Sequence, residues 1–165
     1  MQTRRIEIVS SPIDVGAELA DIYANDAGGV CVFLGTTRSE TNSAGQPLKA
    51  LFYEVYEVLA QKQFQNLVTE AESKFPIRSC ILLHRIGRVD VGQPSVLIAV
   101  ATPHRAESFE ACRWLIDNLK SIASIWKKEL WEDGGTSWVA GTLPVPSPGT
   151  PGEGTARIDF SPRRI

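Results

Sequence analysis

The chain has 165 residues and a net charge of −2, from 17 basic and 19 acidic residues. This length suits one domain with a hydrophobic core of its own. A content of 43% apolar and 22% charged residues is ordinary for a globular protein. The near-neutral charge excludes a general affinity for nucleic acid or anionic membranes, so an anionic ligand would need a local cluster of cations.

Targeting and redox signals favour the cytoplasm. No apolar run approaches the roughly 20 residues of a membrane-spanning helix, and the N-terminus lacks the apolar core of a signal peptide. The three cysteines, Cys31, Cys80 and Cys112, are widely spaced among apolar neighbours and form no CxxC pair. This pattern predicts reduced core residues and no zinc site.

The first part of the chain alternates strands and helices. Apolar patterns predict strands over residues 5–9, 30–34 and 51–56, and the continuous apolar run of the second favours a central strand. Ser10-Ser11-Pro12 is typical of a capped helix start, and that helix is expected to reach about Asn25, with Leu19, Ile22 and Tyr23 on its inner side. The polar segment 39–47 is expected to form a surface loop.

A second helix is predicted over residues 58–75. Its inner face would carry Phe64, Leu67, Val68, Ala71 and Phe75, and Pro76 would end it. Strands are expected over residues 79–84 and 95–101. His84, at the end of the first of these, is interpreted as a hydrogen-bonded strand residue.

The most informative stretch is 102–129, where a buried strand leads into a third helix. The inner face of this helix is predicted to be Phe109, Cys112, Leu115, Ile116, Leu119 and Ile122. His104 and Arg105 stand at its start, where free N–H groups and the positive dipole end favour anions. Lys120 and then Lys127 follow at the far end. The stretch therefore predicts a cationic pocket built on rigid elements.

A C-terminal hairpin is predicted from a strand over 125–131, the turn Glu132-Asp133-Gly134-Gly135 and a strand over 136–140. Strand alternation would place Lys127 on the face of Ile125 and Glu129, opposite Trp126 and Lys128. Only one lysine of the pair can then face a given pocket.

The element order β-α-β-β-α-β-β-α-β-β predicts an α+β fold in a single domain over residues 1–141. We expect one mixed, largely antiparallel sheet with helices packed on it. No GxGxxG or P-loop motif follows a strand, which excludes a doubly wound nucleotide-binding fold. Residues 142–165 are rich in Pro and Gly and are expected to form a poorly ordered tail.

The residues that suggest chemistry are cations: Arg38, His104, Arg105, Lys120 and Lys127. A guanidinium beside a helix N-terminus suits a phosphate or a carboxylate. A lysine among apolar neighbours can move a proton or act as a nucleophilic amine. The alternatives are a solvated loop arginine at position 38 and lysines that simply extend into water. Neither histidine lies beside a GxSxG elbow, so serine hydrolysis has weak support.

Several short motifs then occur in a fixed order: YEVY at 53–56, HRIG at 84–87, VG at 91–92, HR at 104–105, FEAC at 109–112, DNLK at 117–120 and IWKKE at 125–129. Across residues 5–140 the chain closely resembles the family of the catalytic large subunit of molybdopterin synthase. This resemblance implies an α/β-hammerhead-like fold and a sulfurtransferase of molybdenum-cofactor biosynthesis. The family converts cyclic pyranopterin monophosphate into the dithiolene of molybdopterin.

The resemblance also implies partners. Sulfur would arrive as a thiocarboxylate on the C-terminal Gly-Gly tail of a ubiquitin-like small subunit. The large subunit would form a homodimer within a heterotetramer. No permanently bound cofactor or metal is implied, and no nucleic acid or membrane.

The resemblance assigns roles by position. Lys120 and Lys127 match the catalytic lysines of the family: Lys120 would engage the carrier's terminal carbonyl, and Lys127 would act as acid or base on the pterin. The residues that match substrate-holding positions are Arg38, His104 and Arg105, most simply around the phosphate. Their neighbours Thr36, Thr37, Lys128 and Glu129 are expected to contact substrate.

The chain departs from the family pattern at Ser124, where a proline is usual, and a looser turn is expected there. Thr36 and Thr37 replace a more basic loop of some relatives. The tail has no counterpart, and a role for Arg157, Arg163 or Arg164 in closing the pocket stays open. Two other functions fit the same residues. One is a non-catalytic binding module for a phosphorylated ligand and a ubiquitin-like partner, and the other is an unrelated phosphate-ester enzyme that needs no partner.

Overall fold

The computed structural model describes residues 3–122 and 124–139. The predicted tail at 142–165, with its three arginines, lies outside these residues. Eleven elements follow one another in the described part: β1 (Arg4–Val9), α1 (Val15–Leu19), β2 (Gly29–Thr36), β3 (Leu48–Val55), α2 (Glu57–Lys74), β4 (Ser79–Arg85), β5 (Gly87–Asp90), β6 (Pro94–Thr102), α3 (Arg105–Ile122), β7 (Ile125–Trp131) and β8 (Thr136–Trp138).

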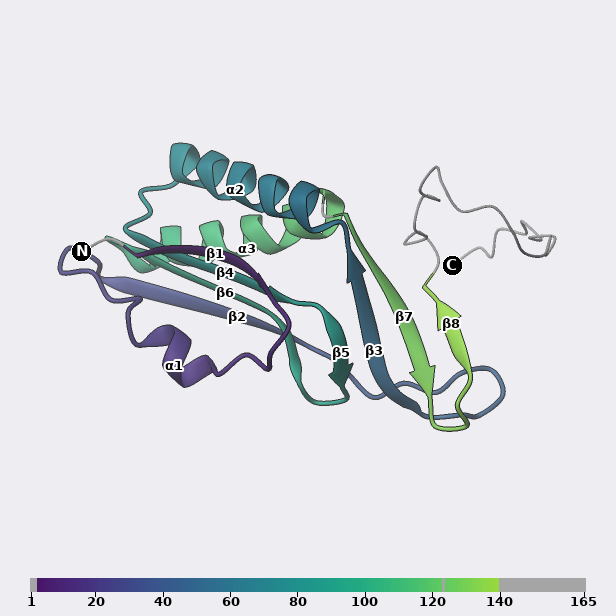
Figure 1. The fold of residues 1–165 in the computed structure, drawn as a ribbon. Coiled ribbons are helices and arrows are strands. Elements are labelled where there is room, and N and C mark those ends of the chain that lie inside the picture. The colour runs from purple at the N-terminus through teal and green to yellow at the C-terminus, as the bar shows by residue number, and fades with distance from the viewer. Residues whose placement is uncertain (1–2, 123, 140–165) are drawn as a thin grey trace.

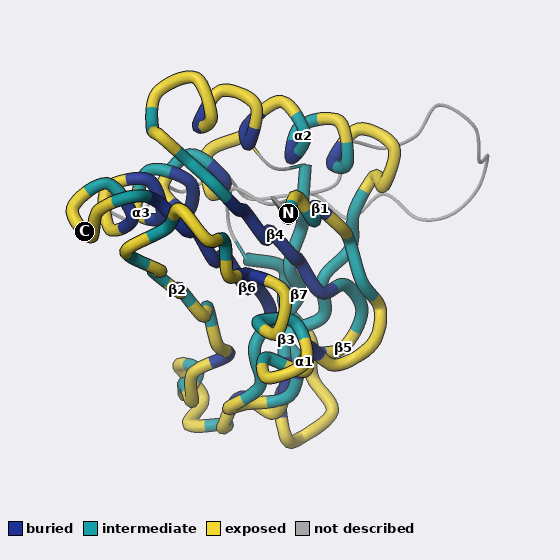
Figure 2. The backbone as a smooth tube through the Cα atoms, turned by 90° about the vertical axis from the view of Figure 1, so that its left-hand side faces the viewer, coloured by how far each residue is buried: buried dark blue, intermediate teal, exposed yellow. Residues whose placement is uncertain are grey.

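The first sheet has the strand order β1-β4-β6-β2, with β1 parallel to β4 and the other pairs antiparallel. Helices α2 and α3 lie on one face, and the short α1 lies on the other (Figure 1). Both faces of β4 are covered, and every residue of that strand is buried (Figure 2). The main core lies between this sheet and the two long helices, with Phe64, Leu82, Ile98 and Leu115 at its centre.

The second sheet has the order β5-β3-β7-β8 and is antiparallel throughout. It extends from the end of the first sheet at which α3 finishes (Figure 1). Strand β7 begins only three residues after α3 ends, so the last turn of α3 and the start of β7 are held close together. This junction between the two sheets positions Lys120 and Lys127.

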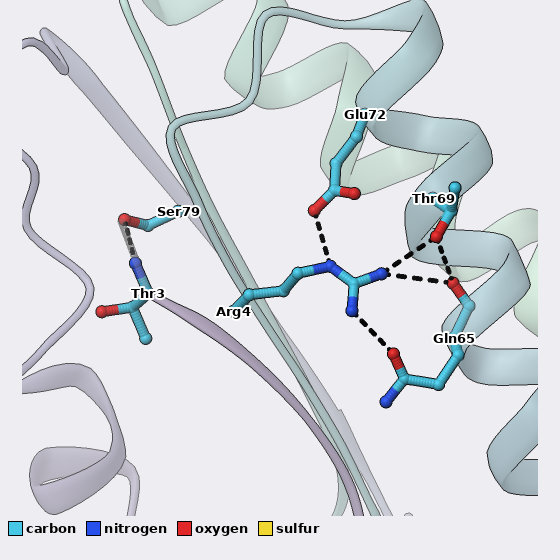
Figure 3. Close-up of polar contacts among 6 residues, drawn as sticks. All are labelled: Thr3, Arg4, Gln65, Thr69, Glu72 and Ser79. Atoms are coloured by element: carbon cyan, nitrogen blue, oxygen red, sulfur yellow. Dashed lines mark hydrogen bonds and ion pairs between the residues drawn. The ribbon is translucent and has the colours of Figure 1, made fainter. Parts of the chain in front are cut away.

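The parallel edge strand β1 is joined to α2 by two side chains: Gln61 Nε2 of α2 donates to the Ile6 carbonyl at 2.7 Å, and Arg4 of β1 makes several contacts. The Arg4 guanidinium donates to Glu72 Oε1 at 2.9 Å, to Gln65 Oε1 at 2.7 Å and to Thr69 Oγ1 at 3.0 Å (Figure 3). A guanidinium has five donors in a fixed fork, which lets it contact three residues of one helix at once. These contacts hold α2 across the edge of the sheet.

The α+β class and the mixed, largely antiparallel pairing are confirmed. The strands nevertheless form two sheets where one was expected, and β5 was not predicted, because four residues are too few for a clear pattern. Strand β2 lies at an edge of its sheet rather than at its centre. Its apolar run is therefore not buried on both faces. Alternate residues, Val30, Val32 and Leu34, form a row on the outer face of β2, and each is 39–40% exposed.

The first helix is shorter than predicted. It spans five residues and is capped by Asp14, whose Oδ1 accepts from the Ala17 N–H at 3.1 Å, so Ser10-Ser11-Pro12 is not its start. Of its three expected inner residues, Ile22 is buried and Leu19 packs against the core, but Tyr23 is 72% exposed. On α3 the predicted inner face is right except at its two ends, since Phe109 and Ile122 are exposed. At the start of the helix the buried positions are Ser108 and Ala111, so Phe109 lies off the inner face.

Candidate active site

Lys120 and Lys127 meet at the junction of the two sheets. Both line a cavity of about 450 Å³ and a neighbouring one of about 280 Å³. The polar lining of the larger cavity is Thr36, Tyr53, His84, Ser95, Lys120 and Lys127, and Phe33, Ile116 and Leu119 form part of its apolar wall. Two amines therefore share one space with polar groups from four strands.

Strand register places Lys127 in the site. Tyr53 of β3 pairs directly with Lys127 of β7, so their side chains lie on the same face of the second sheet. Ile125 lines the larger cavity and Glu129 the smaller one, which confirms the predicted alternation. Lys128 points to the opposite face, where its Nζ lies 4.8 Å from the Trp138 ring centre and 3.7 Å from Glu54 Oε1.

Neither cavity lysine is neutralised within the described part of the chain. None of its ion pairs includes Lys120 or Lys127. Two acids, Glu40 and Glu129, line the smaller cavity. Glu40 is paired with Arg38, and Glu129 accepts a hydrogen bond from Ser137 Oγ at 2.8 Å. Two cations without carboxylate partners make this cavity a favourable place for an anionic ligand.

The deep wall of the larger cavity is polar but uncharged. His84 is 8% exposed, and burial lowers its pKa to about 4, so the ring is neutral at neutral pH. Its ring meets Tyr53 edge to face, with centroids 5.2 Å apart. Burial also raises the pKa of the Tyr53 phenol, and a hydrogen bond with Ser95 offsets part of this rise. The wall can thus exchange hydrogen bonds without adding charge.

Only some residues at the end of β2 and in the loop after it line the cavities. Thr36 and Arg38 line the smaller cavity, and the Arg38 side chain is 84% exposed and paired with Glu40 at 2.5 Å. Thr37 is only 2% exposed, and its backbone N–H donates to the Gln93 carbonyl at 3.0 Å. Thr37 and Lys128 therefore lie outside both cavities, whereas the other predicted neighbours, Thr36 and Glu129, lie within them.

His104 and Arg105 are not brought to the lysines by one chain. They lie at the start of α3, and Lys120 lies 15 residues further along this helix. At 1.5 Å per residue the separation is about 22 Å. The predicted single pocket with cations at both ends of α3 is therefore wrong for one copy of the chain. Both residues are exposed, and they lie beside the first residue of β2.

The residue at position 124 has a contact that a proline could not make. The Ser124 N–H donates to Gln63 Oε1 of α2 at 3.0 Å. Proline has no N–H, so this bond depends on the departure from the family pattern. The bond attaches Ser124 to α2, three residues before Lys127.

The cysteines behave as core residues. Burial raises the pKa of the Cys80 thiol to about 12 and also raises that of Cys112, and all three cysteines are free. Within residues 3–122 and 124–139, no cluster of three or more His, Cys, Asp or Glu side chains could hold a metal ion, and no helix is long and apolar enough to cross a membrane.

Sequence reasoning did not select Tyr53, His84 and Ser95 as site residues. Tyr53 was part of a motif, but its position opposite Lys127 depends on the register between strands that are 70 residues apart in sequence. His84 is hydrogen-bonded through Nδ1 to the Arg85 carbonyl, as predicted, and it also lines the cavity. The signal that could have found them is strand alternation, which needs the pairing to be known.

Comparison with known proteins identifies the family of this site. Residues 8–122 match the model of the MoaE protein family. The chain belongs to the MoaE family. A relative from Nostoc named molybdopterin synthase catalytic subunit is 46% identical over 123 residues, which are 74% of this chain and 72% of the relative. One with the same name from Pyrococcus abyssi is 35% identical over 148 residues, which are 88% and 98% of the two chains.

Solved MoaE-type structures share the fold. Molybdopterin synthase from Staphylococcus aureus superposes with a TM-score of 0.75 at 35% identity, over 82% of this chain and 96% of that one. A complex of subunits 1 and 2 of molybdopterin-converting factor from Helicobacter pylori gives a TM-score of 0.69 at 24% identity, over 82% and 90% of the two chains. The fold of this chain is therefore shared with a solved molybdopterin synthase.

Proposed function

We propose that this chain transfers sulfur from a thiocarboxylated ubiquitin-like small subunit to cyclic pyranopterin monophosphate, forming the dithiolene of molybdopterin. The observation that carries this proposal is the meeting of Lys120 and Lys127 in one cavity, on a chain of the MoaE family. The relatives' name, molybdopterin synthase catalytic subunit, supports the reaction. The Helicobacter complex of two different subunits is in keeping with a second subunit as partner.

The two lysines would have different roles in the reaction. Lys120 is exposed at the end of α3, where an incoming peptide tail has access, and we assign it to the terminal carbonyl of the carrier. Lys127 is half-buried in β7 beside Tyr53, and we assign it to proton transfer on the pterin. Amines in a partly apolar cavity can stabilise developing negative charge and exchange protons. Sulfur comes with the partner, so the proposal needs no bound cofactor.

A second copy of the chain would complete the anion site. Strand β2 and helix α3 begin side by side, because Gly29 lies against the Arg105 backbone. Both elements also end near the same cavity, which Thr36 and Lys120 line. Strand β2 pairs only with β6 in the described sheet and leaves its other edge open. Antiparallel pairing of two β2 edges about a two-fold axis would bring each start beside the partner's end.

In such a homodimer, His104 and Arg105 of one copy would approach the lysines of the other. The exposed row of Val30, Val32 and Leu34 would be covered by the same contact. This arrangement would reconcile the separation of about 22 Å along α3 with a common role in holding the substrate phosphate. With a small subunit at each active site, the assembly is a heterotetramer. The three free cysteines of each copy of this chain suit the reducing cytoplasm.

A single-turnover assay tests the function. The chain is mixed with a thiocarboxylated small subunit and cyclic pyranopterin monophosphate, and formation of the dithiolene is followed. We expect product with the wild type and a loss of at least about 100-fold with Lys120→Ala, since a catalytic amine is removed. Lys62→Ala, at an exposed position of α2, is the matched control and should keep full activity. Equal activity of both variants would remove Lys120 from the mechanism.

A further inference from the structure

His84 has one ring nitrogen fixed and the other available. Its Nδ1 lies 2.9 Å from the carbonyl oxygen of Arg85. A carbonyl can only accept a hydrogen bond, so Nδ1 must carry the ring proton. The neutral tautomer then leaves a lone pair on Nε2, which can only accept.

Nε2 keeps access to the larger cavity. His84 is one of the residues that line this cavity. The buried side-chain nitrogens and oxygens that lack a hydrogen-bond partner in the described chain belong to Thr37, Arg78, Arg85 and Glu107. Nε2 is not among them, and within residues 3–122 and 124–139 no hydrogen bond to it is formed. The 8% of His84 that stays exposed is therefore consistent with an Nε2 that a ligand can reach.

The surroundings keep this acceptor in place and uncharged. The ring is fixed between Tyr53, at a centroid distance of 5.2 Å, and Phe64, at 6.3 Å. Burial disfavours the charged imidazolium and lowers the pKa of His84, although the hydrogen bond to the Arg85 carbonyl acts in the opposite direction. A fixed, neutral acceptor in the same cavity as two cationic donors can distinguish the two ends of a ligand.

We propose that His84 is a ligand-binding residue, whose Nε2 accepts a hydrogen bond from an N–H or O–H group of the substrate held by the two lysines. The inference rests on the proposed function for the identity of that substrate. A reduced pterin carries ring N–H and amino groups, which are donors, and a phosphate, which accepts. His84 would select the heterocycle, because a ligand with a lone pair at this point leaves two acceptors facing each other.

A measurement on the wild-type chain tests the contact directly. The chain has two histidines, so ¹⁵N-histidine labelling gives two sets of ring signals, and His104→Gln assigns them. Without ligand, the His84 signals should show a proton on Nδ1 and a free Nε2. On saturation with cyclic pyranopterin monophosphate, the Nε2 signal should move toward that of a hydrogen-bonded nitrogen while Nδ1 stays unchanged. An Nε2 signal that does not move would overturn the proposal.

Two substitutions separate binding from folding. His84→Asn places an amide near the Nδ1 position, where it can still donate to the Arg85 carbonyl, but it offers no acceptor to the cavity. His84→Gln reaches the Nε2 position and restores an acceptor there. We expect the dissociation constant for the pterin phosphate to rise roughly tenfold in the Asn variant and to return to within about threefold of the wild type in the Gln variant.

The outcomes distinguish the two proposals. Equal binding by the wild type and a folded Asn variant would overturn the role of His84 and leave the proposed function intact. A wild-type chain that binds no pterin phosphate would overturn the proposed function, and the donor assigned to His84 with it. If the Asn variant does not fold, the role of His84 is tested by the Nε2 signal of the wild-type chain on ligand binding.

Discussion

The cavity side chains differ in how firmly the fold holds them. Lys120 and Lys127 have no ion pair within the described residues, so a ligand can reorient their amines at small cost. His84 is instead fixed by its Nδ1 hydrogen bond and by two aromatic rings. The site thus combines adaptable cations with a rigid neutral wall, which suits a ligand with one anionic end.

The buried His84 should make stability depend on pH. Its pKa is about 4 in the folded chain, below the ordinary 6.5, so between these values the unfolded chain binds a proton that the folded chain does not. Proton binding by the unfolded chain does not destabilise the fold above pH 6.5. Below this value, the free energy of unfolding decreases as the pH falls toward 4. From pH 7 to pH 5 the loss is about 2 kcal/mol. Urea unfolding at both values should show this loss in the wild type and not in His84→Gln.

At the scale of elements, the start of α3 is placed by glycine contacts. A Cβ at position 28 would lie 2.4 Å from the Pro103 carbonyl oxygen, and one at position 29 would lie 2.9 Å from the Arg105 Cα. The Gly28 N–H also donates to the Thr102 carbonyl at 3.0 Å. Strand β2 and helix α3 therefore begin in direct backbone contact, which a side chain would prevent.

Gly28→Ala should push this contact apart. The added methyl group meets backbone rather than a flexible side chain, so we expect the free energy of unfolding to fall by about 1–3 kcal/mol. Substrate affinity should fall as well, because His104 and Arg105 are displaced. The control is Gly16→Ala in α1, where the nearest atom is 3.5 Å from the new Cβ. Thermal melts in which the two variants behave alike would contradict the steric account.

The open edge of β2 gives a test of the homodimer. Val32 lies in the middle of this strand with 39% of its surface exposed, so a lysine there should leave the fold intact. In the paired dimer the two lysines would be brought together at the interface and weaken association by at least about tenfold. Sedimentation should show monomers for Val32→Lys and dimers for Val58→Lys, a change at a 76% exposed position of α2.

At the scale of the whole molecule, the two ends of α3 would serve different active sites. In a mixed dimer of Lys120→Ala with Arg105→Ala, one site then carries both changes and the other carries neither. Random reassociation of equal amounts should restore about a quarter of the wild-type sites. If each site lay within one chain, every site would keep one substitution and mixing would restore nothing. Single-turnover rates before and after mixing decide between these arrangements.

The Arg105→Ala chain on its own should mainly lose substrate affinity. Removal of one charged hydrogen bond to phosphate costs about 1.5–3 kcal/mol. A titration with cyclic pyranopterin monophosphate measures this loss. Wild-type affinity would show that Arg105 is outside the site.

The sequence by itself determined the elements and the chemical character of the site. Periodicity located α2, α3 and most strands, because a buried face repeats every 3.6 or 2 residues whatever it packs against. It also placed Lys127 with Glu129 and away from Lys128, since alternation is a property of the strand alone. The motif series further identified the family that the comparisons confirmed.

Only the tertiary structure decided which residues from distant parts of the sequence contact one another. The pairing of Tyr53 with Lys127 and the arrival of His84 in the cavity depend on contacts between strands distant in sequence, which no local pattern encodes. The edge position of β2 likewise depends on which strands pair, and an apolar run looks the same at an edge and at a centre. For the same reason His104 and Lys120, parts of one cationic stretch in sequence, lie at opposite ends of a straight helix.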